Sequence, residues 1–181
     1  MTTKIGFLVE GDVDKAVVEA LASRILGPSF RPYAVRLGGE VALPWAYATV
    51  LSLLEEKHYP HVVLVLDADS TNPNEVERRQ QTLQGSLARH HLGANEVTVC
   101  LAVPSIEAWL LAGQRADPER VLQPKEELRR LLGKLPLSVE RATDLANALD
   151  LAIARQRAPS LDRFGATLER LATALRSGHA A

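Results

Sequence analysis

Acidic residues follow apolar, strand-like runs at three places in the sequence. Asp67 and Asp69 lie one residue apart directly after VVLVL, in the segment VVLVLDADS. Glu10 and Asp14 follow the apolar run IGFLV, and Glu107 follows VTVCLAV in the segment VPSIEAW. Neighbouring carboxylates repel each other unless water screens them or a cation lies between them. Carboxylate oxygens are the ligands that Mg²⁺ and Mn²⁺ prefer in proteins, so these residues favour a divalent-cation site.

Glycine and serine residues accompany the acids. Gly11 comes directly after the first predicted strand, and Gly38 and Gly39 end the second. A residue without a side chain lets a phosphate or a metal ion approach the backbone closely. Ser105, in the same segment as Glu107, supplies a hydroxyl that can bind or orient a ligand.

These residues also have structural interpretations. Asp12 and Ser105 are good helix N-caps, and Asp14 complements a helix dipole. Asp67 and Asp69 are harder to explain in this way, because a carboxylate pair at the end of a buried strand is costly without a cation. Acids at several strand ends of one sheet therefore favour a metal site over separate structural roles.

The elements that position these residues are strands alternating with helices. Apolar runs predict strands over 4–9, 33–37, 61–66 and 96–103. Helical spacing predicts helices over 13–26, 44–57 and 74–92, and a short one in SIEAWLLA. This alternation predicts an α/β fold with a mostly parallel four-stranded sheet flanked by helices. Open α/β sheets bind ligands at the carboxyl ends of their strands, so we expect the acids to meet there.

The character of the chain changes after Gly113, where a connector rich in turn-forming residues leads only into helices. We expect an α/β domain over 1–115 and a helical extension over 116–181 that packs on it. Ser138 and Ser160 are the predicted N-caps of two of these helices. The predicted helices of the extension span 124–132, 138–156 and 160–176.

Charge and cysteine content narrow the class of protein. The net charge is −1, so a nucleic acid would have to be bound by local basic clusters or by bound cations. The single cysteine, Cys100, lies in an apolar run and is expected in the core, and the absence of a dense His/Cys cluster argues against zinc.

No apolar run approaches the roughly 20 residues that span a bilayer, and the start lacks a signal-peptide pattern. We expect a cytoplasmic protein without a membrane segment. The candidate basic clusters are Arg78-Arg79, Arg89-His90-His91 and Arg129-Arg130.

Four ordered motifs resemble a known family. VEGDVDKAVVEALASRIL resembles the opening of a Toprim domain, and VVLVLDADS is similar to the Toprim DxD strand. The closer likeness is to the Toprim nuclease domains of the OLD (overcoming lysogenization defect) proteins. Those domains carry Glu, Gly, DxD and SxE after successive strands, and the likeness covers about residues 4–112. The segments PSIEAWLLA and PSLDRF also look like those of small stand-alone bacterial Toprim-like proteins.

The resemblance implies a divalent-metal-dependent nuclease that hydrolyses phosphodiester bonds, with DNA as the expected nucleic acid. It implies a pair of Mg²⁺ or Mn²⁺ ions, of which one activates a water molecule and the other stabilises the leaving 3′-oxygen. The implied metal ligands are Glu10, Asp14, Asp67, Asp69, Ser105 and Glu107, and the implied catalytic residues among them are Glu10, Asp67, Asp69 and Glu107. Gly11, Gly38 and Gly39 would let a phosphate approach the backbone.

Two departures from the OLD pattern concern its ATPase half and its basic residue. The chain shows no ATPase half, so any nucleotide-driven regulation either comes from an ATPase partner protein, as in a two-protein bacterial defence system, or does not exist. OLD-type nucleases also use a basic residue outside the acidic motifs. The candidates here are Lys125, Arg155 and Arg157.

Other functions use some of the same residues. LDADST fits the DxDxT pattern of haloacid-dehalogenase-type phosphatases, in which Asp67 would be the nucleophile and Asp69 the acid and base. That motif, however, follows the third predicted strand, and the interpretation leaves Glu10 and Glu107 without a role. A nucleotide-sugar transferase could hold a metal ion with a DxD motif, but the chain is short for one. The main alternative is a Toprim-fold subunit that binds metal or nucleic acid, or regulates an ATPase, without cleavage.

Overall fold

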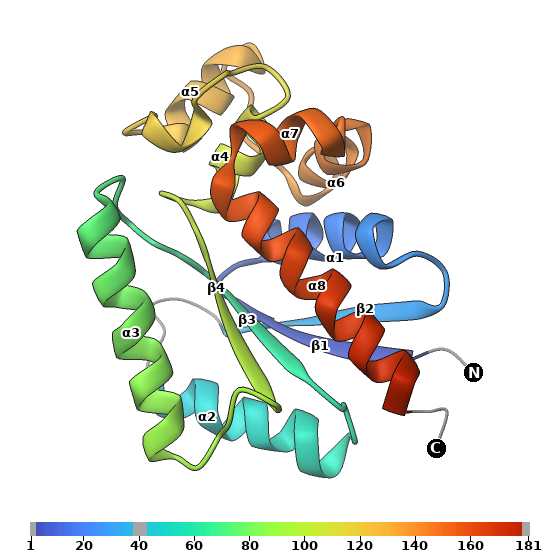
Figure 1. Cartoon of the computed structure of the whole chain (residues 1–181). Coiled ribbons are helices and arrows are strands. Elements are labelled where there is room, and N and C mark those ends of the chain that lie inside the picture. Colours follow the sequence, from blue (N-terminus) through green and yellow to red (C-terminus); the bar gives the residue numbers. More distant parts are fainter. Residues whose placement is uncertain (1–2, 38–42, 179–181) are drawn as a thin grey trace.

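The fold is built on a sheet of four parallel strands, as a computed structural model of residues 3–37 and 43–178 shows (Figure 1). The strands are β1 (Thr3–Val9), β2 (Phe30–Arg36), β3 (Val62–Asp67) and β4 (Val97–Ala102). Their order across the sheet is β2-β1-β3-β4, and every neighbouring pair is parallel. The predicted α/β fold with a four-stranded sheet is therefore confirmed.

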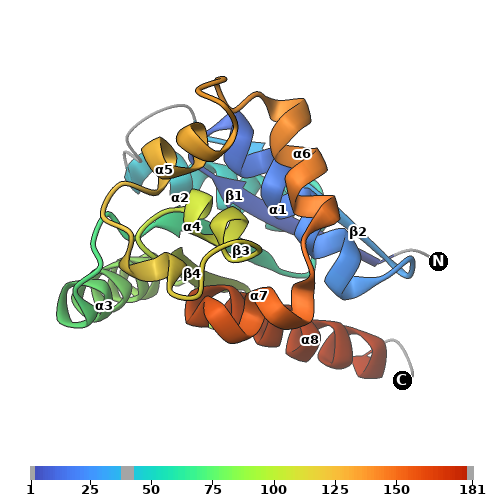
Figure 2. The same cartoon turned by 90° about the horizontal axis from the view of Figure 1, so that it is seen from above.

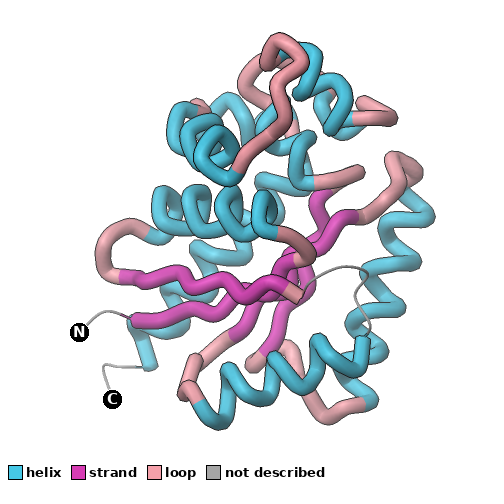
Figure 3. Tube along the Cα trace, turned by 180° about the vertical axis from the view of Figure 1, so that it is seen from behind, coloured by secondary structure: helices cyan, strands magenta, loops and turns pink. Residues whose placement is uncertain are grey.

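Helices cover both faces of the sheet. The face with α2 (Leu43–Leu51) and α3 (Pro73–Arg89) buries Leu64 and Leu66 of β3, and the π-helical turn Ser52–Glu56 continues α2. The opposite face buries Val63 and Val65 beneath α1 (Asp12–Leu26) and α8 (Pro159–Gly178). Figure 3 shows the strands between these two helical layers. Because both faces of β3 are covered, its sequence is continuously apolar rather than alternating.

The chain after β4 consists of helices. Their bounds are α4 Ile106–Leu111, the 3₁₀ turn Pro118–Arg120, α5 Pro124–Leu131, α6 Val139–Ala148 and α7 Leu151–Arg157. The prediction of one helix over 138–156 is wrong, because the backbone becomes extended at Leu149 (φ −64°, ψ 128°). Asp150 then caps α7 by accepting a hydrogen bond from the Ile153 N–H at 3.1 Å.

Helix caps differ from the sequence-based expectation at two positions. Gly11, not Asp12, is the N-cap of α1, and Asp12 instead accepts a hydrogen bond from Arg36 at 2.8 Å. Ser160 lies inside α8, which begins at Pro159, so it is not an N-cap. Ser138 does cap α6, since its hydroxyl accepts a hydrogen bond from the Arg141 N–H.

The helices beyond residue 116 share an apolar core with the sheet. The Trp109 ring of α4 is fully buried and stacks on Phe164 of α8, with ring centroids 5.1 Å apart. The Ser160 hydroxyl accepts hydrogen bonds from the Trp109 Nε1–H at 2.7 Å and from the Val103 N–H at 3.2 Å. Arg24 of α1 donates to the carbonyl oxygen of Ala146 in α6 at 2.6 Å. These contacts attach α6 and α8 to the layer that covers the sheet.

Two further observations concern burial and length. Cys100 is buried, as expected, with 8% of its surface exposed. Within residues 3–37 and 43–178, none of the helices combines the length and the apolar character needed to cross a membrane.

Candidate metal centre at the carboxyl edge of the sheet

The acidic motifs meet where three neighbouring strands end. Glu10 follows β1, Asp67 is the last residue of β3, and Ser105 is the N-cap of α4 just after β4. The strand order places β1, β3 and β4 side by side, so these chain segments are neighbours in space. Figure 2 shows the molecule from above, with α5, α6 and α7, which lie at the top of Figure 1, nearest the viewer.

Asp67 links the ends of all three strands through hydrogen bonds. Its N–H donates to Glu10 Oε1 at 3.3 Å, which connects β3 to the segment after β1. Its Oδ1 accepts a hydrogen bond from the Ile106 N–H at 3.0 Å, at the first residue of α4. The Ile106 N–H therefore orients the Asp67 carboxylate, and the Asp67 backbone orients the Glu10 carboxylate.

Asp14 is fixed at the start of α1. Its Oδ2 accepts a hydrogen bond from the Gly11 N–H at 2.7 Å, which orients the carboxylate across the N-cap. A Cβ atom at Gly11 would lie 3.2 Å from that same oxygen, a tight contact. Glycine at this position thus makes room for the Asp14 carboxylate rather than for an unusual backbone angle.

Ser105 and Glu107 form a pair at the start of α4. The Ser105 hydroxyl donates to Glu107 Oε2 at 2.7 Å and makes no capping hydrogen bond to the helix. The hydroxyl therefore orients the Glu107 carboxylate in this structure.

The carboxylates raise each other's pKa values. Burial raises the pKa of Asp67 to about 8, with further increases from Asp14, Glu107 and Glu10, while the hydrogen bond from Ile106 opposes them. Burial also raises the pKa of Asp14, as does the Glu107 charge, whereas the hydrogen bond from Gly11 lowers it. Without a cation, Asp67 would therefore hold a proton at neutral pH. A bound cation would replace that proton, because metal ligands bind in their deprotonated form.

Glu10 lies on the other side of Asp67. Burial raises the pKa of Glu10 most, the Asp67 N–H lowers it, and the charges of Asp69 and Asp14 raise it. The charge of Arg79 acts in the opposite direction and lowers the Glu10 pKa.

Arg79 of α3 pairs with two of the acids. Its Nη1 lies 3.1 Å from Asp69 Oδ2, and its Nη2 lies 4.0 Å from Glu10 Oε1. Its Nε is buried and has no hydrogen-bond partner among the described residues. A buried donor without a partner is uncommon and is satisfied when an oxygen ligand binds beside it.

Asp69 is the most exposed of the site acids that form ion pairs. Its side chain is 65% exposed, and its backbone adopts the left-handed conformation with φ 55°. Its N–H donates to the Pro104 carbonyl oxygen at 2.9 Å, which ties the DADS loop to the end of β4.

The donor set fits Mg²⁺ or Mn²⁺ in kind, because it consists of carboxylates and one hydroxyl. As placed, however, no three His, Cys, Asp or Glu side chains among the described residues converge closely enough to hold an ion. The acids are thus neighbours that share a strong negative field, with Arg79 balancing part of it, rather than a preformed cage of ligands.

The predicted helper residues lie in different surroundings. Lys125 of α5 is close enough to lower the pKa of Asp14 by its charge. The Arg155 guanidinium instead pairs with Asp162 at 2.7 Å and with Glu169 at 2.5 Å. The Arg157 guanidinium donates to the carbonyl oxygens of Ala112 and Gly113, at the end of α4. Gly38 and Gly39 lie outside the residues that the structure describes.

From the sequence, Arg79 is only one member of the candidate basic cluster Arg78-Arg79. Arg79 lies about two turns into α3, which begins at Pro73 soon after Asp67 and Asp69, and this position indicates that it could reach them. What the sequence does not show is which face of α3 points toward the end of β1. Arg78, the neighbouring residue in the sequence, has no side-chain partner among the described residues.

Comparisons of the chain with protein-family models, with curated proteins and with solved structures found no match.

Proposed function

We propose that the chain is a divalent-metal-dependent nuclease of Toprim type, which hydrolyses phosphodiester bonds at the carboxyl edge of its sheet. The observation that carries the proposal is the position of Asp67. It ends a buried strand, contacts the segments that follow both neighbouring strands, and is surrounded by Glu10, Asp14 and Glu107. The resemblance of the four motifs to Toprim sequences supports the same site.

The proposed ligands are the acids grouped around Asp67, with Ser105 orienting one of them. They are Glu10, Asp14, Asp67, Asp69 and Glu107. When bound, Mg²⁺ or Mn²⁺ would lower the pKa of a water molecule and stabilise negative charge on phosphate oxygens. The protein's own contribution is to hold these carboxylates beside the strand ends and to bury Asp67 so that a cation takes the place of its proton.

Arg79 is the proposed phosphate-binding residue. A guanidinium binds phosphate oxygens well, and its Nε is a buried donor without a partner in the described structure. A phosphate near Asp69 would take the guanidinium away from the carboxylate at 3.1 Å and leave that carboxylate free for a cation. Arg79 would thus neutralise Asp69 in the free protein and bind the phosphate when substrate is present.

The proposed substrate is a nucleic acid, with DNA as the first to test. The net charge of −1 supplies no general attraction for a polyanion, so cations at the acidic edge and Arg79 would provide it locally. An ATPase partner protein remains part of the proposal on the strength of the OLD resemblance alone.

The position of Asp67 disfavours the phosphatase mechanism. Asp67 ends β3, the third strand along the chain, and the phosphatase assignment gives no role to Glu10 and Glu107, which lie beside it.

One observation favours the non-catalytic alternative, a subunit that binds nucleic acid without cleaving it. The ion pair of Arg79 with Asp69 occupies one of the proposed ligands. If that pair persists when nucleic acid is bound, Asp69 is not available for a metal ion.

Cleavage of supercoiled plasmid tests the proposal. The wild-type protein should nick plasmid in 5–10 mM Mg²⁺ or Mn²⁺ on the order of hundreds of times faster than in EDTA, the size of effect expected from losing a metal-assisted step. Asp67→Asn should remove this activity, and Asp144→Asn, an exposed acid on α6, serves as the matched control. Undiminished cleavage by purified, folded Asp67→Asn would refute the assignment. Plasmid binding without cleavage by the wild type would favour the binding subunit.

A further inference from the structure

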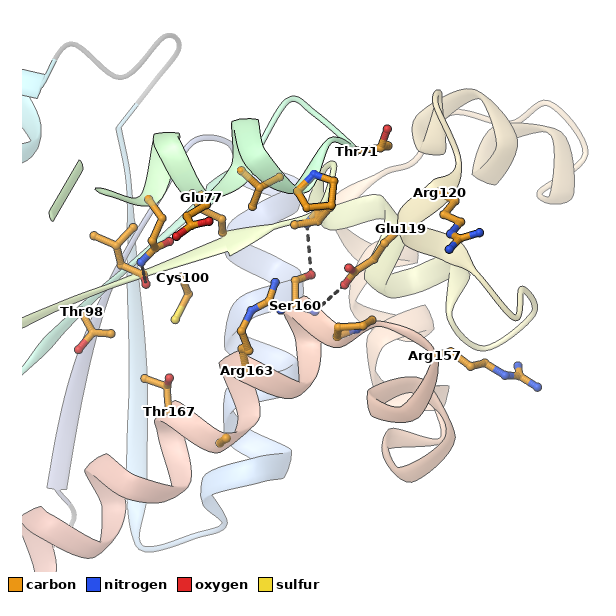
Figure 4. A pocket seen from close by; sticks show the side chains of 18 of the residues that line it. Thr71, Glu77, Thr98, Cys100, Glu119, Arg120, Arg157, Ser160, Arg163 and Thr167 are labelled. Carbon is orange, nitrogen blue, oxygen red and sulfur yellow. Dashed lines mark hydrogen bonds between the residues drawn. The ribbon is translucent and has the colours of Figure 1, made fainter. Parts of the chain in front are cut away.

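A groove lies beside β4, on the side of the molecule where the sheet ends. It has a volume of about 1180 Å³ and runs between α3 and α8, with β4 as its floor (Figure 4). Gln80, Gln81 and Gln84 line it from α3, and Arg163, Thr167 and Arg170 line it from α8. β4 has one neighbouring strand, β3, so its other edge faces this groove.

The hydrogen-bonding groups of β4 alternate between the sheet and the groove. The Ala102 carbonyl oxygen accepts a hydrogen bond from the Ala68 N–H, on the β3 side. Successive residues of a strand direct their backbone groups to opposite sides, so those of Val99, Leu101 and Val103 point into the groove. The contacts agree with this alternation, since Gln80 Nε2 donates to the Val99 carbonyl oxygen at 2.8 Å.

Part of this edge is without partners. Ser160 accepts a hydrogen bond from the Val103 N–H, and Gln80 occupies the Val99 carbonyl. Between them, and counting only the described residues, the Val99 N–H and both backbone groups of Leu101 have no hydrogen-bond partner. Unpaired strand edges are the surface on which extended peptides add as a further strand.

The α8 wall of the groove is positively charged. Arg163 and Arg170 are exposed, and neither forms an ion pair with a carboxylate in the described structure. Arg170 donates to the Thr167 hydroxyl at 3.2 Å, and Figure 4 shows Arg163 projecting from α8 toward β4. Burial raises the pKa of the Cys100 thiol in the floor, and the charges of both arginines act against that increase, which places them close to β4. The facing wall presents the Gln80, Gln81 and Gln84 amides together with the Glu77 carboxylate, so the carboxylates of a ligand fit the α8 side and not the α3 side.

We propose that this groove binds an extended, acidic segment of a partner polypeptide, which pairs with the free edge of β4 and places carboxylates against Arg163 and Arg170. Backbone pairing with Val99 and Leu101 would supply affinity, and the arginines would select for acidic side chains. The proposal does not depend on the metal site or on nuclease activity.

The lining favours a peptide over a nucleic acid. No aromatic side chain lines the groove among the described residues, so it offers no surface for stacking bases. The groove also contains the acids Glu77, Asp117 and Glu119, which would repel a chain that carries a phosphate at every unit. An extended peptide can avoid them, because alternate side chains of a strand point to one face and can place its carboxylates on the α8 side. Free backbone donors and an acceptor at strand spacing match a polypeptide instead.

Binding of a defined peptide tests the proposal. The probe is a fluorescein-labelled nine-residue peptide of alternating threonine and glutamate, added at up to 1 mM to ¹⁵N-labelled protein. We expect hydrogen exchange of the Val99 and Leu101 amides to slow at least tenfold. In a peptide of the same charge with proline in place of threonine, the fixed proline φ and the missing N–H groups prevent a regular strand from pairing along β4, so this peptide should give no protection. Protection by both peptides, or by neither, would overturn the proposal.

Charge reversal separates the groove from general electrostatics. The double variant Arg163→Glu, Arg170→Glu should weaken peptide binding at least tenfold. Lys57→Glu, Lys134→Glu changes the net charge equally at exposed positions that do not line the groove and should bind as the wild type does. Equal loss in both double variants would contradict the proposed contacts.

The variant Asp67→Asn separates peptide binding from the proposed nuclease site, and an oligonucleotide tests whether the groove binds nucleic acid instead. Asp67→Asn should bind the peptide with wild-type affinity, because the groove does not include the acidic edge. Single-stranded oligothymidine should leave the Val99 and Leu101 amides unprotected. Protection of these amides by the oligonucleotide but not by the peptide would mean that the groove binds nucleic acid and would overturn the peptide proposal.

Discussion

At the scale of single residues, Asp67 determines how the candidate site responds to protons and cations. The hydrogen bond from the Ile106 N–H holds its carboxylate among its acidic neighbours, and its own backbone N–H holds one of them, Glu10. Burial disfavours the charged form of this carboxyl group and raises its pKa to about 8. Protons and divalent cations therefore compete for the same group.

This competition predicts an unusual dependence of stability on pH in the absence of metal. The folded Asp67 keeps its proton up to about pH 8, whereas the unfolded residue loses it near its ordinary value of 3.8. The folded state binds more protons across this window, so the free energy of unfolding should fall as the pH rises, by at most about 1.4 kcal/mol per unit. Glu10 and Asp14, whose pKa values are also raised, act in the same direction.

Urea denaturation in EDTA between pH 5 and pH 8 measures this dependence. Asp67→Asn should show a shallower slope and be more stable than the wild type at pH 8. Buried His61, whose pKa is lowered by burial, makes stability rise with pH in both proteins, so the test is the difference between them. Identical slopes for the wild type and Asp67→Asn would contradict the raised pKa.

Arg79 offers a second prediction at this scale. Arg79→Gln removes the positive charge between Glu10 and Asp69 and should lower the metal-free stability by about 0.5–1 kcal/mol, the range for partly exposed ion pairs. The control is Arg78→Gln at the neighbouring position, where the side chain has no partner among the described residues. Equal urea midpoints for the two variants at pH 8 would show that Arg79 does not balance the acids.

At the scale of elements, the sequence predicted β1, β3 and β4 to within one residue because each is a short apolar run. β2 begins at Phe30 instead of residue 33, because apolar and exposed polar residues mix in its first half. The acids could be assigned to one edge because parallel strands share their direction. The errors occurred where local signals conflict. Asp150 interrupts a helical pattern by capping a new helix, and Pro159 starts α8 one residue before the predicted cap. The role of Arg79 depends on the rotation of α3 about its axis, which the predicted elements alone do not show.

The misassigned Ser160 leads to a prediction about how α8 is attached. Its hydroxyl accepts hydrogen bonds from Trp109 and Val103, so Ser160→Ala leaves buried donors without an acceptor. The free energy of unfolding should fall by about 1–3 kcal/mol. Ser177→Ala, an exposed serine near the end of the same helix, should change it by less than about 0.5 kcal/mol. Comparable losses in the two variants would refute the anchoring role.

At the scale of the whole molecule, the sheet and the C-terminal helices share a core. Trp109, Phe164 and Phe7 belong to one apolar cluster, in which the Phe7 and Phe164 rings lie 6.3 Å apart. The expected division at residue 115 therefore separates residues that pack against each other.

A fragment of residues 1–115 tests whether the first segment folds alone. Without α6 and α8 it exposes the sheet face that contains Phe7 and Val63, so we expect no cooperative thermal transition by circular dichroism and strong binding of a hydrophobic dye. The full chain, measured in parallel, is the control. A cooperative transition of the fragment at the melting temperature of the full chain would establish an independent domain.

The most direct test of the metal site is calorimetric titration with Mn²⁺ at pH 7 in two buffers of different ionisation enthalpy. We expect saturable binding that releases close to one proton, because a cation displaces the proton that Asp67 holds below about pH 8. Asp67→Asn should bind far more weakly and release no proton, while Asp144→Asn should behave as the wild type does. Absence of Mn²⁺ binding by the wild type, or equal binding by Asp67→Asn, would contradict the account.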